Sequence, residues 1–539
     1  MFIKKLYIKN YKLFKERTIE LNDNLNIFVG NNDSGKSTLL EIIAIITTGK
    51  INGYSFDRQI KPSMFNAEVK NEYLNSIENG EYSSPPSIIL EAYIDGLDAK
   101  YSGTNNECFE NFAGIRLEVS ISETNENIYK TMLENKDIVD IPVELYRVQS
   151  TYFSGENTAY RYLPINTLFV DTTRKDYSNL INHFVSNSFT DNLSDEQLND
   201  IAIAYKNSKN SFRDNKTIKD LNEILKEKEI LDEKSYSISL KEETVDEWKN
   251  QMCILVDSIP FSNLGFGTQN FIKIGLAVND NLKEPDILLL EEPENNLSYS
   301  NMNILVSHIL ENNNKQVFIS THSSYIANKL NMNNLFLLNN GYVTSYSLLN
   351  EDTQRYFSKL PGYDTLRFIL SKRVVLVEGS TDDLIIQRAY KDRAHNLPIE
   401  DGIDIISVGS LAMKRYLDLA KITNKEVIVV TDNDGDKALN IFKKYKDYIE
   451  DNNFYFYYEN NDELNTIEPS VLNANSIDEI PSDIFKRVIS KNNSLVSRDY
   501  NGVLEFMLNN KTEWAFRVFD SDENIEYPEY IINVIEKLI

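Results

Sequence analysis

Short apolar runs bounded by glycine, proline or charged residues recur in both halves of the chain. Apolar runs without polar alternation are typical of parallel strands that are covered on both faces. Stretches with helical spacing lie between them, so the pattern predicts an α/β fold in each half. The predicted strands are Leu6–Ile8, Leu25–Val29, Ile88–Ile94, Ile287–Leu290, Val317–Ile319, Leu335–Leu338, Arg373–Val377, Ile403–Val408 and Val427–Val430.

The chain is long enough for at least two domains, because its 539 residues, 41% of them apolar, exceed what one hydrophobic core usually organises. We expect the first domain over residues 1–345. From about 175 to 249 the sequence becomes polar and charged with helical spacing, which predicts a helical insert. This insert is either a dimerisation element or a solvated surface. Residues 346–370 then form a connection, and residues 371–539 form a second α/β domain with a C-terminal extension.

A phosphate-binding loop follows the second predicted strand. The segment from Gly30 to Ser37 satisfies G-x-x-x-x-G-K-[ST] and opens a helical run. Its glycines allow backbone N–H groups to surround phosphate oxygens, Lys36 reaches the β and γ phosphates, and the Ser37 hydroxyl ligates Mg²⁺. We therefore expect ATP to be bound by Gly30, Asn31, Asn32, Asp33, Ser34, Gly35, Lys36, Ser37 and Thr38.

Carboxylates and a histidine follow two later strands of the first domain. Glu291 and Glu292 directly follow Ile287–Leu290, so we expect Glu291 to hold the metal and Glu292 to polarise the attacking water. His322 follows the next strand, where ATPases of the ABC type place a switch histidine. The order of these motifs along the chain is that of an ABC-type ATPase.

A glycine-containing segment lies between the phosphate-binding loop and these carboxylates. Ser262–Gln269 looks like a degenerate version of the ABC-type signature and precedes an apolar helix. In that motif the glycines and the helix N-terminus contact the γ-phosphate held by another subunit. We therefore expect Gly265, Gly267 and Gln269 to contact nucleotide across a homodimer interface.

Carboxylates also follow two predicted strands of the second half. Glu378 ends the first of them, and Asp382 stands one helical turn further on. Asp432, Asp434 and Asp436 follow the second strand, and in an extended backbone all three would project the same way. Clustered ionised carboxylates favour a cation, although acidic turns after buried strands are the simpler alternative.

A glutamate at one strand end and Asp-x-Asp at a later one is similar to the Toprim pattern of topoisomerases, primases and OLD nucleases. Asn465–Glu468 resembles the segment in which this family carries a further carboxylate, and Asn510–Ala515 resembles its segment with a catalytic lysine, Lys511. With these segments and the ATPase motifs, this chain resembles the OLD (overcoming lysogenization defect) family. The family usually has Asp where this chain has Glu291.

The resemblance implies an ABC-type P-loop ATPase domain with a helical insert, followed by a Toprim α/β domain that hydrolyses DNA with two Mg²⁺ or Mn²⁺ ions. It implies DNA as a partner and a homodimer or higher homo-oligomer. It also implies antiphage defence, beside a helicase-like protein or a retron reverse transcriptase with its RNA. The implied nuclease metal ligands are Glu378, Asp382, Asp432, Asp434 and Glu468. The implied catalytic residues are Glu292, His322, Glu378, Asp432, Asp434 and Lys511.

Composition limits the remaining possibilities. A net charge of −26 argues against a protein that coats nucleic acid non-specifically, but it allows a local basic groove. Cys108 and Cys253 are far apart and lack ligand-spaced neighbours, so neither a disulfide framework nor a zinc site is expected. No apolar stretch reaches the length of a membrane span, and we expect a cytoplasmic protein.

Two other functions fit part of the sequence. An SMC-like tethering ATPase would explain residues 1–345 but not the carboxylates after residue 371, and long heptads are missing. A topoisomerase would need a tyrosine nucleophile, and its organisation does not place an ABC-type ATPase before the Toprim domain.

Overall fold

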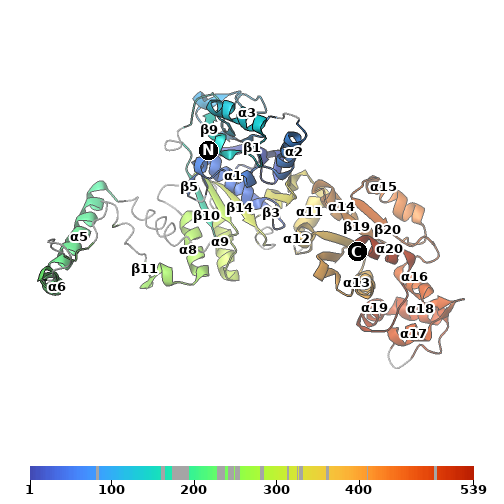
Figure 1. Ribbon diagram of the computed structural model, residues 1–539. Coiled ribbons are helices and arrows are strands. Elements are labelled where there is room, and N and C mark those ends of the chain that lie inside the picture. The colour runs from blue at the N-terminus through green and yellow to red at the C-terminus, as the bar shows by residue number, and fades with distance from the viewer. Residues whose placement is uncertain are drawn as a thin grey trace.

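The computed structural model describes residues 1–51, 53–80, 84–158, 164–172, 193–227, 237–240, 248, 255–278, 285–311, 315–323, 326, 330, 332–359, 363–409, 411–490 and 494–539. They form an N-terminal α/β part, a C-terminal α/β part beside it, and a pair of helices that stands apart from both (Figure 1). No helix within the described ranges is long and apolar enough to cross a membrane.

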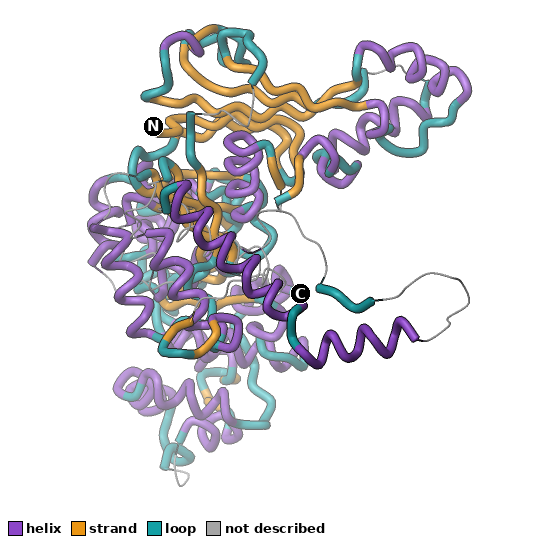
Figure 2. Tube along the Cα trace, turned by 90° about the vertical axis from the view of Figure 1, so that its left-hand side faces the viewer, coloured by secondary structure: helices purple, strands orange, loops and turns teal. Residues whose placement is uncertain are grey.

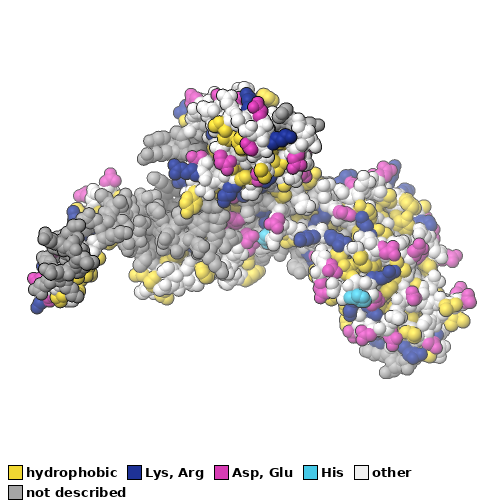
Figure 3. Space-filling model, viewed as in Figure 1, with side chains coloured by type: hydrophobic (Ala, Val, Ile, Leu, Met, Phe, Trp, Pro, Cys, Tyr) yellow, Lys and Arg dark blue, Asp and Glu magenta, His cyan; other side chains and the backbone are white. Residues whose placement is uncertain are grey.

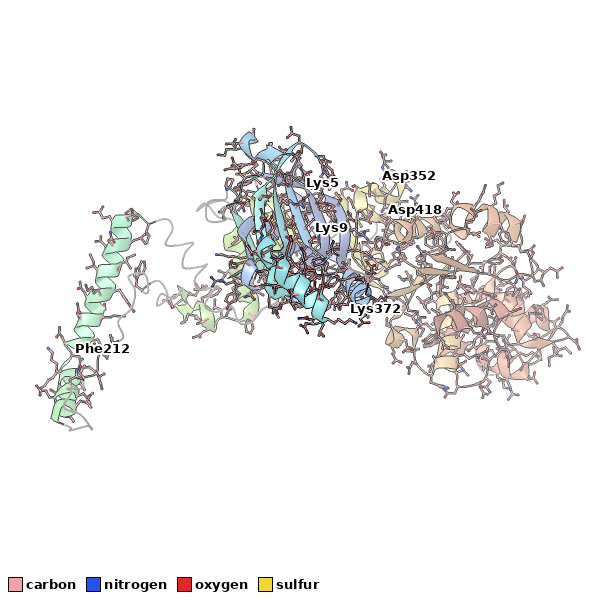
Figure 4. All side chains as sticks on the ribbon, turned by 45° about the horizontal axis from the view of Figure 1, so that its top comes forward. Lys5, Lys9, Phe212, Asp352, Lys372 and Asp418 are labelled. Atoms are coloured by element: carbon pink, nitrogen blue, oxygen red, sulfur yellow. The ribbon has the colours of Figure 1, made fainter. Side chains whose placement is uncertain are left out.

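An antiparallel sheet opens the N-terminal part, in the order β2-β1-β6-β8-β7 with β9 also paired to β8. In Figure 2 its strands form an extended layer at the top of the molecule. Side chains alternate along β1, so Leu6 and Ile8 are buried in the core whereas Lys5 and Lys9 lie on the opposite face (Figure 4). The strands are β1 (Phe2–Tyr11), β2 (Phe14–Glu20), β6 (Ile88–Asp95), β7 (Ser102–Gly103), β8 (Phe112–Ile121) and β9 (Tyr146–Tyr152). The helices beside them are α2 (Ala67–Glu78) and α3 (Glu126–Asn135).

The ATPase motifs lie on a second sheet, in the order β10-β13-β14-β3-β15-β16. All its pairs are parallel except β15–β16. Both faces are buried, because Phe28 and Phe318 pack in one core with α1 while Ile27 and Ile319 pack in a second core on the other face. This explains the uninterrupted apolar runs and confirms the four strands predicted here. The strands are β3 (Leu25–Gly30), β10 (Thr167–Asp171), β13 (Ile287–Glu291), β14 (Gln316–Thr321), β15 (Leu335–Asn339) and β16 (Tyr342–Ser345). The helices are α1 (Lys36–Thr48), α8 (Phe266–Val278) and α9 (Tyr299–Glu311).

Two helices of the predicted insert are described, α5 (Asp195–Arg213) and α6 (Lys216–Glu227). They stand away from both domains, and Phe212 lies near their junction (Figure 4). Several of their large apolar side chains are exposed, namely Ile203, Phe212, Leu221 and Ile224. The two ends of the predicted insert, at 175–192 and 241–247, lie outside the described residues.

The C-terminal part is built on a fully parallel sheet in the order β18-β17-β19-β20. Its strands are β17 (Arg373–Val377), β18 (Ile403–Ser407), β19 (Val427–Val430) and β20 (Phe454–Tyr457). Its helices are α13 (Ser380–Ala394), α14 (Met413–Ile422), α15 (Lys446–Ile449), α16 (Ile467–Ala474), α17 (Asp483–Ile489), α18 (Tyr500–Asn509), α19 (Lys511–Asp520) and α20 (Glu529–Leu538), together with a π-helix at Ala438–Lys443. The three strands predicted in this half are confirmed.

The predicted connection contains two helices, α11 (Glu351–Lys359) and α12 (Tyr363–Leu370). One hydrophobic core runs from the second face of the ATPase sheet through these helices to the C-terminal sheet. Side chains also bridge the two parts: Asn339 donates to the Thr423 carbonyl at 3.0 Å, and Lys425 donates to the carbonyls of Phe368, Ile369 and Ser371. The two α/β parts therefore share a packed junction.

Candidate functional sites

The nucleotide motifs converge at the carboxyl edge of the parallel ATPase sheet. A cavity of about 480 Å³ is lined by residues of the phosphate-binding loop together with Glu292 and His322. They meet because β13, β14 and β3 are neighbouring parallel strands whose carboxyl ends share one edge. The lining residues are Leu13, Asn32, Asp33, Gly35, Lys36, Ser37, Thr38, Glu292 and His322.

Lys36 lies among carboxylates in this cavity. Burial lowers its pKa to about 8, although Glu292, Asp33 and Glu291 oppose the shift. Its ammonium donates to the carbonyls of Gly30 and Asn31, at 2.8 and 2.7 Å. Phosphate oxygens would replace these two neutral acceptors with charged ones, so the lysine fits the role that the motif predicts.

Glu292, which we expect to polarise the attacking water, contacts His322, the predicted switch histidine. His322 Nε2 lies 3.3 Å from Glu292 Oε1, and Asn295 donates to Glu292 Oε2 at 2.9 Å. Glu292 has a positive φ of 44°, an uncommon conformation that turns the chain directly after the strand. Burial and Lys36 lower the pKa of His322, so its imidazole is neutral near pH 7. Glu291 is buried at the end of β13.

Glu294 is a residue that the sequence pattern did not single out. Its Oε1 accepts from the Thr321 hydroxyl at 2.6 Å and from the backbone N–H groups of His322 and Ser323, at 2.9 and 3.1 Å. The carboxylate thus fixes the segment that carries the predicted switch histidine. The sequence did contain a signal for this residue, because Glu294 is the third acidic residue in Glu-Glu-Pro-Glu. Unlike the first two, it does not directly follow the strand.

The signature segment lies outside the cavity. Gly267 packs against its own chain, because a Cβ there would lie 2.1 Å from the Asn296 carbonyl oxygen. Asn270 donates to the Asn295 carbonyl at 3.2 Å and joins the same two segments. Gly265, in contrast, has no atom of the described residues within 4 Å of a Cβ position, and Gln269 folds back onto the Leu264 carbonyl. The glycine at position 267 is therefore explained by packing within one chain, whereas Gly265 is open to a ligand.

A second site is formed at the carboxyl edge of the C-terminal sheet. Glu378 follows β17 and Asp432 follows the adjacent strand β19, so the parallel pairing brings them together. Asp382 stands in the first turn of α13, and Glu468 in the first turn of α16. Burial raises the pKa of Asp382 to about 7, and the charges of Glu378 and Glu468 add to the effect.

Asp432 shows the same crowding more strongly. Burial, together with the charges of Asp382, Glu378, Glu468 and Asp434, raises its pKa to about 9. Mutual repulsion of this kind requires that the predicted carboxylates lie close together. A divalent cation would relieve the repulsion and compensate the burial of the charges, so these residues fit an oxygen-coordinated Mg²⁺ or Mn²⁺.

Three of the five carboxylates accept a hydrogen bond from the protein. Asp382 accepts from the Gly379 N–H at 3.0 Å, Glu468 accepts from the Thr466 hydroxyl at 2.7 Å, and Glu378 accepts from the Thr431 hydroxyl. Accordingly, the described residues contain no three His, Cys, Asp or Glu side chains already arranged around a single point. Side-chain rotation of these carboxylates would be part of cation binding.

Lys511 begins α19 and lies at this site. Its Nζ is 3.9 Å from Glu468 Oε1, while the lysine side chain is 59% exposed and the glutamate 2%. The lysine thus lies on the solvent side of the buried carboxylates, where an incoming phosphate would pass.

The expectation that Asp432, Asp434 and Asp436 project the same way is wrong. The chain turns at Asp434 and Gly435, with φ values of 48° and 79°, instead of staying extended. Asp436 accepts from the Leu439 N–H at 3.0 Å and caps the π-helix. Asp432 and Asp434 therefore remain with the carboxylate group, and Asp436 has a local structural role.

Comparison with known proteins identifies two domains in the chain. Residues 1–327, more than half of the chain, match the family described as AAA ATPase domain. The chain belongs to this family. Residues 369–434 match the family described as overcoming lysogenization defect protein-like, TOPRIM domain. It is thus an α/β protein in which a P-loop ATPase domain is followed by an OLD-like Toprim domain, as the motifs predicted.

Curated relatives match parts of the chain. An ATP/GTP phosphatase of Helicobacter pylori is 24% identical over 348 residues, which are 60% of this chain and 85% of the relative. The DNA replication and repair protein RecF of Clostridium tetani is 38% identical over 60 residues, 11% of this chain. The chain spans only 16% of the length of that RecF protein.

Two solved structures align with the chain. An SMC head bound to the C-terminal winged-helix domain of ScpA covers 64% of this chain and 99% of its own, at 12% identity and a TM-score of 0.35. The recombination mediator protein RecF with ATP covers 64% of this chain and 97% of its own, at 12% identity and a TM-score of 0.30. The assignment of the two domains rests on the family matches.

Proposed function

We propose that this chain is an ATP-hydrolysing, divalent-metal-dependent DNA endonuclease, with the ATPase in residues 1–345 and the nuclease in residues 371–539. The observation that carries the nuclease half is the mutual crowding of buried carboxylates at the ends of β17 and β19, with Lys511 beside them. Such a group is costly to bury unless a cation binds it, and Toprim chemistry provides the reason for a cation.

Each residue of the nuclease site has a specific role in this proposal. Glu378, Asp382, Asp432, Asp434 and Glu468 hold the cations. Bound Mg²⁺ or Mn²⁺ supplies an activated water and neutralises charge on the phosphodiester. Lys511 reaches the phosphate from the solvent side and stabilises the added negative charge of the transition state.

The ATPase half rests on the cavity that unites Lys36, Glu292 and His322. Lys36 binds the β and γ phosphates, while Ser37 and Glu291 hold Mg²⁺. Glu292 orients the attacking water, and its contact with His322 links that water to the γ-phosphate. The exposed turn at Gly265 completes the site of a second copy, so hydrolysis requires a homodimer. Exposed apolar side chains on α5 and α6 support a dimer contact there.

The substrate of the nuclease half is DNA, contacted locally. Acidic and basic side chains are interspersed over the C-terminal part on the face drawn in Figure 3, which agrees with contact by a few lysines and bound cations instead of a broad basic surface. The OLD-like family match supports a role in antiphage defence, with a helicase-like protein or a retron reverse transcriptase and its RNA as partners.

Incubation of supercoiled plasmid with the protein and Mg²⁺ or Mn²⁺, with and without ATP, tests this function. Nicked or linear product is expected. ATP turnover without any change in the plasmid would favour an SMC-like tethering ATPase instead, and relaxed closed circles would favour a topoisomerase. Mapping the product ends then defines the preferred DNA.

A further inference from the structure

Thr431 links the two strand ends that carry the nuclease carboxylates. It directly follows β19 and precedes Asp432, and only 4% of it is exposed. Its hydroxyl donates to Glu378 Oε1 at the end of β17. A threonine hydroxyl has a single proton, so this contact uses the only proton that the Thr431 side chain can donate. One oxygen of Glu378 is thereby held by Thr431.

The side chains around Thr431 are buried. Tyr445 is fully buried behind it, and its ring packs against Phe456 with 5.2 Å between centroids. Burial raises the pKa of Tyr445 to about 12, with the charge of Glu378 adding to the effect, which places this phenol close to the carboxylate. Within the described part of the chain the Tyr445 hydroxyl has no hydrogen-bond partner.

The π-helix explains why this tyrosine lies here. Ala438–Lys443 forms a π-helical segment, in which the Lys444 N–H donates to the Leu439 carbonyl five residues earlier. A π-helical turn inserts an extra residue into the helix and shifts the side chains that follow it. Tyr445 is the second residue after this segment and is thereby placed behind Thr431 and the Asp434 turn. π-helical turns of this kind are found frequently at functional sites.

We propose that Thr431 is a positioning residue of the nuclease site, whose hydroxyl fixes the Glu378 carboxylate for binding of a divalent cation. The inference rests on the proposed function for the identity of the reaction, but it concerns cation binding by this chain's own residues. Hydrogen-bond partners of carboxylate ligands typically change metal affinity or activity by about 10–100-fold when they are removed. Thr466 makes the corresponding contact to Glu468, so a threonine donor serves each of two glutamates at the site.

Mn²⁺ binding to the whole protein without DNA, followed by calorimetry and by electron paramagnetic resonance, tests this role. Thr431→Val keeps the shape but removes the hydroxyl, and it should weaken Mn²⁺ binding by about 10–100-fold. Thr431→Ser restores the donor and should stay within about threefold of wild type. Thr365→Val is the matched control, because Thr365 in α12 is equally buried and its hydroxyl has no partner within the described residues.

Unchanged Mn²⁺ affinity in Thr431→Val, or equal weakening by Thr431→Ser, would overturn the proposal. Equal weakening by Thr365→Val would also overturn it, because the effect would then be general destabilisation. If the wild type binds Mn²⁺ and Thr431→Val weakens it, but no DNA is cleaved under any condition, Thr431 keeps its positioning role and the nuclease function fails. Where cleavage occurs, Thr431→Val should need more Mn²⁺ for half-maximal rate and approach the wild-type rate at saturation.

Discussion

Replacing Asp432 with asparagine should stabilise the cation-free protein while removing cation binding. Its carboxyl is buried among four other carboxylates, which raises its pKa from 3.8 to about 9. The folded state therefore holds this proton over a pH range in which the unfolded chain has lost it. Because the folded state binds more protons, its stability falls as the pH rises from about 4 to about 9. Asparagine is neutral at every pH and removes this dependence.

The magnitude follows from the size of the shift. One pKa unit corresponds to about 1.4 kcal/mol, so at pH 8 the carboxyl costs on the order of 2–5 kcal/mol, reduced by its coupling to Asp382. For a domain of this size, each kcal/mol shifts Tm by about 2–4 °C, and the variant should unfold roughly 5–15 °C higher in EDTA. At pH 5 the gain should be much smaller, because the stability falls only once the pH exceeds the unfolded pKa of 3.8, and pH 5 lies little above it.

Thermal unfolding of Asp432→Asn and wild type, in EDTA and in Mn²⁺, provides the assay. Mn²⁺ should raise the Tm of the wild type more than that of the variant. The difference in Tm between the two proteins should therefore become smaller or change sign when Mn²⁺ is present. Asp436→Asn is the control, because Asp436 caps the π-helix from outside the carboxylate group and should change Tm little. A lower Tm for Asp432→Asn in EDTA, or an equal gain from Mn²⁺, would refute the crowded cation site.

Three further outcomes are expected. Glu292→Gln should still bind ATP, while turnover falls by about 10²-fold because the charge that orients the water is lost; nucleotide binding and steady-state turnover measure the two effects. Homodimers of Lys36→Ala and of Gly265→Asp should each lack ATP turnover, whereas mixed dimers should regain up to about half of the wild-type turnover, because a two-fold dimer then has one intact site. No recovery in verified mixed dimers would argue against a shared site. Lys425→Met should lower the free energy of unfolding by about 2–4 kcal/mol, because three buried carbonyls lose their donor, whereas exposed Lys421→Met should change it little; denaturant unfolding measures both.

Gly265 is a better choice than Gly267 for the mixed-dimer experiment. A side chain at Gly267 would collide with the Asn296 carbonyl of the same chain, so its substitution would damage each subunit by itself. Within the part of the chain that the structure describes, no atom lies within 4 Å of a Cβ at Gly265, so an aspartate there would not collide with these residues and would instead affect a second subunit that contacts this turn. Loss of turnover in Gly265→Asp therefore reports on a second copy more directly.

The strands could be predicted because burial on both faces leaves uninterrupted apolar runs, as at Ile287–Leu290 and Val427–Val430. The grouping of carboxylates at strand ends could also be predicted, since parallel strands bring their carboxyl ends to one edge of the sheet. The turn at Asp434 was not predicted, because an Asp-x-Asp-Gly run has no period and the turn depends on a positive φ at a non-glycine residue.

Contacts between distant side chains left no pattern in the sequence. Thr431 and Glu378 are 53 positions apart, and Glu294 binds the N–H of a residue 28 positions later. The junction formed by Asn339 and Lys425 depends on how two domains pack, which no local spacing encodes. Such contacts fix the orientation of the functional groups, so sequence patterns identified the groups but not what positions them.

The separation of the two chemistries is tested most directly by one comparison in the loop after β19. Asp434→Asn and Asp436→Asn change the same side chain at positions two residues apart, only the first of which belongs to the carboxylate group. Plasmid cleavage and ATP turnover are measured on the same preparations with Mn²⁺. Asp434→Asn should abolish cleavage and keep ATP turnover within a fewfold of wild type, while Asp436→Asn keeps both activities. Cleavage that survives in Asp434→Asn, or equal loss of ATP turnover and cleavage in that variant alone, would contradict a separate Toprim nuclease site.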